Sequence, residues 1–148
     1  MERVARERPR ARWHALIPAL QFLHVFFAIM WFGSQYYTMF VLIPQIRKLP
    51  KEHGDALLAN LRNGPARTVT LVAATGTIVF GILRGLAGNA LADPTSAYGL
   101  TYLASLAIGL AMLAWVWTRG FFGRGRSWMY NTAFAVMFVL MIAMRFGY

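Results

Sequence analysis

The sequence predicts an all-α integral membrane bundle of four transmembrane helices, with a short amphipathic surface helix in the first loop. Composition is the first observation: 58% of the 148 residues are hydrophobic and only 14% are charged, which is far from the average of soluble domains. The second is that the apolar residues form four runs, each long enough to cross a hydrocarbon core of roughly 30 Å. The third is that the 15 Lys and Arg, against 5 Asp and Glu, lie mainly between these runs. Cations placed there anchor membrane loops, so we expect a lipid bilayer and no nucleic acid as partner.

The chain divides into a basic N-terminal tail, residues 1–15, and a single transmembrane domain, residues 16–148. The tail carries five arginines. The sequence has no cysteine, which excludes disulfides, thiolate metal sites, covalent c-type haem attachment and cysteine nucleophiles.

The first transmembrane helix is predicted at about residues 20–43. Its segment FLHVFFAIMWFGSQYYTMFVLI contains no charge and is long enough to span the bilayer. A cleavable signal peptide would end in small residues, but here aromatic residues continue to Phe40. We therefore expect this segment to remain in the protein.

The second helix is predicted at residues 68–88. Thr77, Gly81 and Gly85 repeat every four residues along one side of it, and small residues in such a stripe let another helix approach closely in lipid. A packing face within one bundle is favoured over a dimer interface.

The third and fourth helices are predicted at residues 99–117 and 128–146. The third ends in Trp115 and Trp117, and the fourth begins at Trp128. Because tryptophan favours the headgroup region of a bilayer, these residues support the predicted helix ends.

Three connections join the helices. The first contains Leu57, Leu58 and Leu61 at helical spacing between two prolines, which predicts the amphipathic surface helix. The second has a turn at Asp93-Pro94. The third, RGFFGRGRS, is a predicted hairpin of glycine and arginine.

Orientation follows from the positive charge on each side of the membrane. The first and third loops together carry eight Lys and Arg against five in the tail, and short cytoplasmic loops are the more basic ones. We expect a multi-pass protein of a bacterial-type inner membrane with these loops in the cytoplasm. The eight cations are Arg47, Lys48, Lys51, Arg62, Arg67, Arg119, Arg124 and Arg126.

One side of the first helix is unusually polar. Spacings of three and four residues predict that this side faces into the bundle. Packing by interhelical hydrogen bonds is one interpretation, and a functional site is the other. The residues on this side are Gln21, His24, Ala28, Trp31, Gln35 and Met39.

Helices of alternating direction bring further residues to the level of His24. The start of the first helix lies level with the end of the second, the start of the third and the end of the fourth. This places His24 with Arg84, Tyr102, Met141, Met144 and Arg145 at one membrane face.

This composition predicts a haem b site. His24 would be one axial ligand, Met141 or Met144 the other, and the two arginines would pair with the propionates. Tyr102, together with Trp31 and Gln35 of the polar side, completes the candidate site. Snorkelling of Arg84 and Arg145 to the headgroups is the competing explanation.

Copper is the alternative to haem, because thioether and imidazole groups suit Cu(I). Met137, Met141 and Met144 lie on roughly one side of the fourth helix, and Met30 and Met39 lie on the first. Methionine is also an ordinary filler of apolar gaps. No Asp or Glu lies in a predicted span, which disfavours a small proton-coupled antiporter.

The first helix, LHVFFAIMWFGSQYYTMFVLIP, resembles that of the superfamily containing CopD-type copper-resistance membrane domains and HemJ-type protoporphyrinogen oxidases. The likeness extends through Arg67, through Thr75-Gly76 and Gly81, and to the last helix, NTAFAVMFVLMIAMRFGY, so it covers about residues 20–148. It implies haem b bound through a first-helix histidine, here His24. The HemJ-type enzymes also use a membrane lysine, and the only lysines here are Lys48 and Lys51 of the first loop.

We therefore expect a membrane haem b protein that transfers electrons, or oxidises a small molecule or a quinol, as a possible haem-dependent oxidoreductase. Two alternatives stay open. One is a non-catalytic small subunit of a larger respiratory or photosynthetic complex, and the other is a copper-handling membrane protein. Membrane protein partners or a homo-oligomer are compatible with either.

Overall fold

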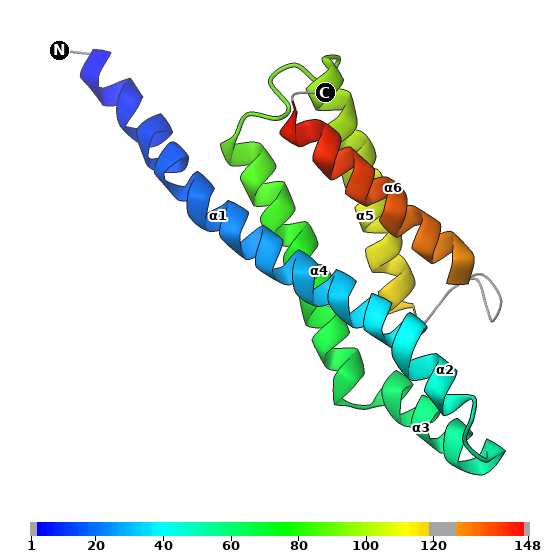
Figure 1. Cartoon of the computed structure of the whole chain (residues 1–148). Helices are drawn as coiled ribbons and strands as arrows, with labels where there is room; N and C mark the ends of the chain where they lie inside the picture. Colours follow the sequence, from blue (N-terminus) through cyan, green and yellow to red (C-terminus); the bar gives the residue numbers. More distant parts are fainter. Residues whose placement is uncertain (1–2, 119–126, 147–148) are drawn as a thin grey trace.

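Helices account for all regular secondary structure in the described part of the chain. The computed structural model describes the backbone of residues 3–118 and 127–146, and the side chains of residues 16–118 and 128–146 (Figure 1). The helices are α1 (Arg3–Tyr37), the π-helix η1 (Thr38–Leu42), α2 (Ile43–Ile46), α3 (Lys51–Asn63), α4 (Pro65–Ala87), α5 (Ala97–Trp117) and α6 (Ser127–Arg145).

Four helical stretches are long and apolar enough to cross a membrane, in agreement with the predicted all-α chain of four transmembrane helices. They are Leu16–Ile46, Lys51–Ala87, Ala97–Trp117 and Trp128–Arg145.

The first span exceeds its predicted bounds at both ends. α1 begins at Arg3, so the basic tail continues the helix, in keeping with the high helix propensity of its arginines and alanines. At the other end, η1 and α2 prolong the helix to Ile46 without a break. Pro44 lies in the first turn of α2, where a missing backbone N–H is tolerated.

The first connection contains the helix α3. α3 packs back against α2, where the buried Gly54 faces Ile46, itself only 3% exposed. A Cβ at Gly54 would lie 3.2 Å from the Ile46 carbonyl oxygen, so glycine permits the close approach.

The second connection is a sequence of tight turns. α4 ends in a Schellman motif: Asn89 has a positive φ of 54°, and the Ala90 N–H donates to the Gly85 carbonyl. The predicted turn at Asp93 is present, with its carboxylate accepting from the backbone N–H groups of Thr95 and Ser96. Ser96 then caps α5 by accepting from the Gly99 N–H. The predicted hairpin of the third connection, with its three arginines, lies outside the described residues.

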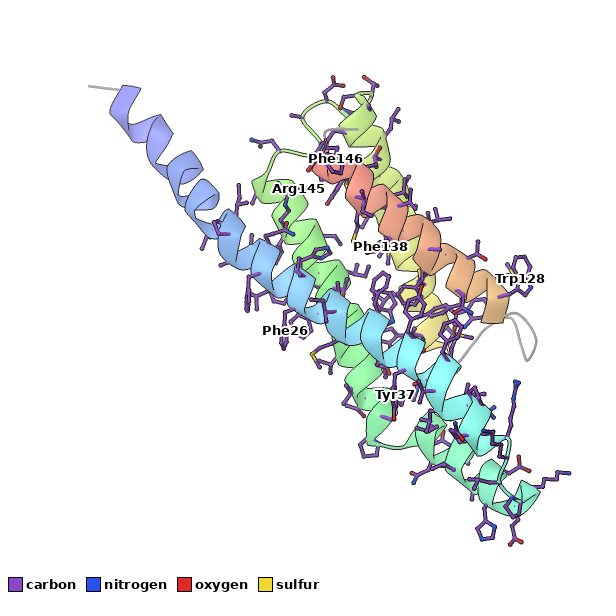
Figure 2. The ribbon with its side chains drawn as sticks, in the orientation of Figure 1. Phe26, Tyr37, Trp128, Phe138, Arg145 and Phe146 are labelled. Atoms are coloured by element: carbon purple, nitrogen blue, oxygen red, sulfur yellow. The ribbon has the colours of Figure 1, made fainter. Side chains whose placement is uncertain are left out.

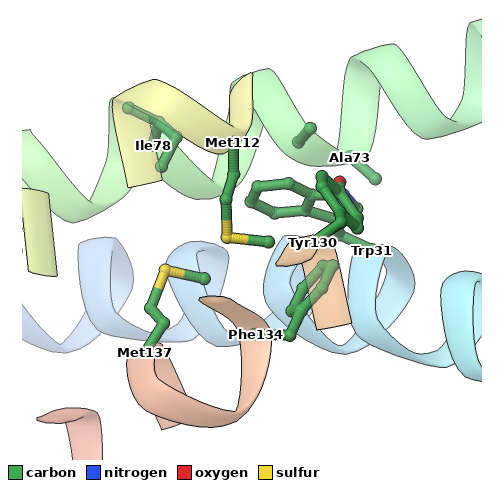
Figure 3. Close-up of a cluster of buried hydrophobic side chains, with 8 residues drawn as sticks. Trp31, Ala73, Ile78, Met112, Tyr130, Phe134 and Met137 are labelled. Carbon is green, nitrogen blue, oxygen red and sulfur yellow. The ribbon is translucent and has the colours of Figure 1, made fainter. Parts of the chain in front are cut away.

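α1 packs along α4, and α5 packs between α4 and α6. The core lies where all four meet (Figure 3), and Trp31 and Phe134 are its fully buried large side chains. Trp31 packs edge-on against Phe134 with ring centroids 5.1 Å apart, and Phe32 packs on the same ring. These contacts join α1 to α6 at mid-height, whereas towards its N-terminus α1 diverges from α5 and α6 (Figure 1).

Candidate functional site

The divergence of α1 from α5 and α6 leaves a cavity of about 1160 Å³, lined by residues from α1, α4, α5 and α6. Most of the lining is apolar, with polar groups at the end formed by the last turn of α4. Among the lining residues are the six that the sequence predicts at one level, namely His24, Arg84, Tyr102, Met141, Met144 and Arg145. The structure therefore places these six residues, which come from four helices, around one cavity.

His24 is held in a defined orientation by α4. Its Nδ1 lies 2.8 Å from the Thr77 carbonyl oxygen, and because a carbonyl only accepts, Nδ1 must carry the proton and donate. The Nε2 atom then has the free lone pair. Gly81 makes this approach possible, since a Cβ there would lie 3.0 Å from the imidazole ring.

His24 lines the cavity, and its Nε2 atom is the ring nitrogen left unpaired. It has no hydrogen-bond partner among the residues that the structure describes. No side-chain nitrogen or oxygen in this part of the chain is both enclosed and unpaired, so Nε2 must be reachable. An imidazole anchored through Nδ1–H to a carbonyl, with Nε2 free, is the arrangement of a typical metal-binding histidine.

Arg84, in the last turn of α4, is fixed by two neighbours. Its Nε donates to Gln21 Oε1 at 2.9 Å, and its Nη1 donates to the Tyr98 hydroxyl at 2.8 Å. α1 and α5 therefore hold this guanidinium group at the polar end of the cavity, and it does not extend freely to a headgroup region.

Tyr102 lies one turn beyond Tyr98 on α5. Its ring and hydroxyl lie directly over Gly85, where a Cβ would collide with both. The small-residue stripe is thus a packing face inside the bundle, as predicted: Thr77 and Gly81 receive His24, and Gly85 receives Tyr102.

The α6 residues line the cavity from the other side. Met141 and Met144 are half-buried, and Arg145 is exposed at the end of α6. Arg145 lies at the same end of the bundle as the last turn of α4 (Figure 2). For Arg145, the snorkelling interpretation and the site interpretation both fit this position.

Trp31 and Gln35 do not line the cavity. Trp31 is fully buried in the core, and its Nε1 donates to the Tyr130 hydroxyl at 3.1 Å. Gln35 also hydrogen-bonds Tyr130. The polar side of α1 faces inward, as predicted, but its second half meets the core.

The methionines of the copper interpretation are divided between different surroundings. Met137, Met141 and Met144 line the cavity, whereas Met30 and Met39 do not. Within the described residues, no three His, Asp or Glu side chains gather as a metal-binding group.

Tyr98 is the site residue that the sequence reasoning missed. It precedes Tyr102 by four residues, so both lie on one face of α5. This spacing could have identified Tyr98 as a second residue of the site.

Comparison of the chain with protein-family models, with curated proteins and with solved structures finds no match.

Proposed function

We propose that this chain is a membrane protein that binds haem b in the cavity, with His24 as an axial ligand. The observation that carries the proposal is the free Nε2 of His24, a residue that the Thr77 carbonyl orients and that lines a large apolar cavity. A cavity of about 1160 Å³ is larger than the usual small-molecule site, about 300–1000 Å³, and so has room for a large cofactor.

The other lining residues suit the same group. Met141 and Met144 are the candidates for a second axial ligand, because thioethers are established haem ligands. Arg84 and Arg145, at the polar end, would pair with the propionates. Bound haem would supply one-electron chemistry, so the proposed role is electron transfer, or oxidation of a small molecule or a quinol.

The placement in the membrane is part of the proposal. The first and third loops would lie in the cytoplasm of a bacterial-type cell, because together they carry more cations than the tail. α3 would lie on that membrane surface, with Leu57, Leu58 and Leu61 toward the lipid.

An absorbance spectrum tests the haem proposal directly. Detergent-purified protein from haem-replete cells is expected to show a Soret band, and His24→Ala is expected to lose it because no other histidine lines the cavity. His53→Ala is the matched control, since His53 is exposed on α3, and it should keep the spectrum.

Two results would contradict the proposal. One is a colourless wild-type protein, and the other is a His24→Ala spectrum identical to that of the wild type. A colourless chain that co-purifies with a stable membrane complex would favour the non-catalytic subunit instead.

A further inference from the structure

Arg84 carries its charge without a carboxylate partner in the described part of the chain. Its hydrogen-bond partners, Gln21 and Tyr98, are both neutral. A charge close to a hydrocarbon region is costly unless it is paired. Because two neutral acceptors occupy only two of the five guanidinium N–H groups, others remain for a ligand.

Tyr102 adds a second unpaired donor at the same place. The residue is only 8% exposed, yet its hydroxyl has no hydrogen-bond partner among residues 16–118 and 128–146. Since the described residues contain no enclosed unpaired oxygen, this hydroxyl is accessible, and the residue lines the cavity. Burial of a tyrosine with a free hydroxyl toward a cavity points to a ligand that accepts the hydrogen bond.

The cavity also opens sideways, between α1 and α6. Exposed apolar side chains line it on both helices: Val25 and Ile29 on α1 are 41% and 67% exposed, and Phe138 and Val139 on α6 are 54% and 62% exposed. In a bilayer these side chains meet lipid, so a ligand with an apolar body can enter from the membrane.

We propose that Arg84 and Tyr102 form an anion-binding subsite, which takes the carboxylate or phosphate head of an amphiphile whose apolar body fills the rest of the cavity. Charge complementarity selects the head, because the described polar end carries arginine and no acid. The inference stands without His24. If haem is bound, its propionates are heads of this kind, and other anionic amphiphiles satisfy the same chemistry.

The test uses the full chain with the His24→Ala substitution, so that haem binding through His24 does not contribute. The purified protein is mixed with oleate, phosphatidylglycerol or phosphatidylcholine, and native mass spectrometry measures how much of each is retained. Oleate or phosphatidylglycerol should be retained above phosphatidylcholine. Preference for oleate identifies a carboxylate ligand, and preference for phosphatidylglycerol identifies a lipid phosphate.

Substitutions then locate the site. Arg84→Gln should weaken retention of the anion about tenfold or more, as expected for loss of a charged hydrogen bond, and Tyr102→Phe about fivefold. Retention by Arg84→Lys should lie between that of the wild type and that of Arg84→Gln, because lysine keeps the charge but lacks the planar guanidinium group. Arg67→Gln is the matched control: Arg67 lies at the opposite end of α4, where it donates to the Trp117 carbonyl, and its loss should change nothing.

Equal retention of the anionic and zwitterionic lipids would overturn the inference, as would unchanged retention in both Arg84→Gln and Tyr102→Phe. If Arg84→Gln does not fold, Tyr102→Phe and Arg84→Lys still test whether the subsite binds the anion. Anion retention in a protein that never shows a Soret band would leave this inference standing while the haem proposal fails.

Discussion

Replacing Trp31 with alanine is expected to lower the free energy of unfolding by about 3 kcal/mol, at the low end of the range for truncation of a buried tryptophan. Trp31 is fully buried and contacts Phe134, and its indole N–H pairs with the Tyr130 hydroxyl. The low end applies because unfolded transmembrane helices stay in apolar surroundings, so the loss is of packing rather than of hydrophobic transfer. Denaturation with SDS in mixed micelles measures the change.

Two variants control this prediction. Trp31→Phe keeps most of the ring and loses the hydrogen bond, so it should cost about 1 kcal/mol. Trp128→Ala removes a tryptophan that is 64% exposed at the start of α6 (Figure 2), and it should cost much less than Trp31→Ala. A similar loss for Trp31→Ala and Trp128→Ala would contradict the packing in Figure 3.

The second large effect is expected at Gly85. Gly85→Ala places a methyl group against the ring and hydroxyl of Tyr102, and a rigid ring cannot yield as a flexible chain end does. Either α4 and α5 separate or Tyr102 leaves its position, at a cost of about 2 kcal/mol, as for other overpacked interiors. Retention of oleate or phosphatidylglycerol should fall together with stability, because Tyr102 is half of the proposed subsite.

Gly33→Ala is the control for Gly85→Ala. A Cβ at Gly33 would have no neighbour within 4 Å, so alanine is expected to be neutral or to stabilise α1 by up to about 1 kcal/mol. If Gly33→Ala lowered stability as much as Gly85→Ala in the same denaturation assay, the cost at Gly85 would not come from the approach of α5.

Much of the fold could be predicted because a membrane restricts the secondary structure that a chain can adopt. Runs of about 20 apolar residues must form helices there, and α5 begins within two residues of its predicted position and ends where predicted. The extension of α1 to Arg3 was not predictable from hydropathy, because the tail is charged and its helix depends on propensity and continuity with the span.

The candidate site could be predicted to the extent that it depends on how deep each residue lies in the membrane. Alternating helix directions place His24, Arg84 and Met144 at one level, and they share one cavity. Depth along a single helix is less informative: from Gln21 to Gln35 the polar side of α1 extends about 21 Å, and it passes from the cavity into the core. Trp31 therefore shares a side with His24 but not its surroundings.

The π-helical turn at Thr38–Leu42 also changes the direction in which the side chains of α2 point. Each residue added to a helix rotates the following side chains by about 100°, so a widened turn gives α2 a different azimuth from the bundle-facing side of α1. Ile46, which follows this turn, is buried against Gly54 of α3. The π-helical turn thus separates the direction of α2, which meets α3, from the alignment of α1 along α4.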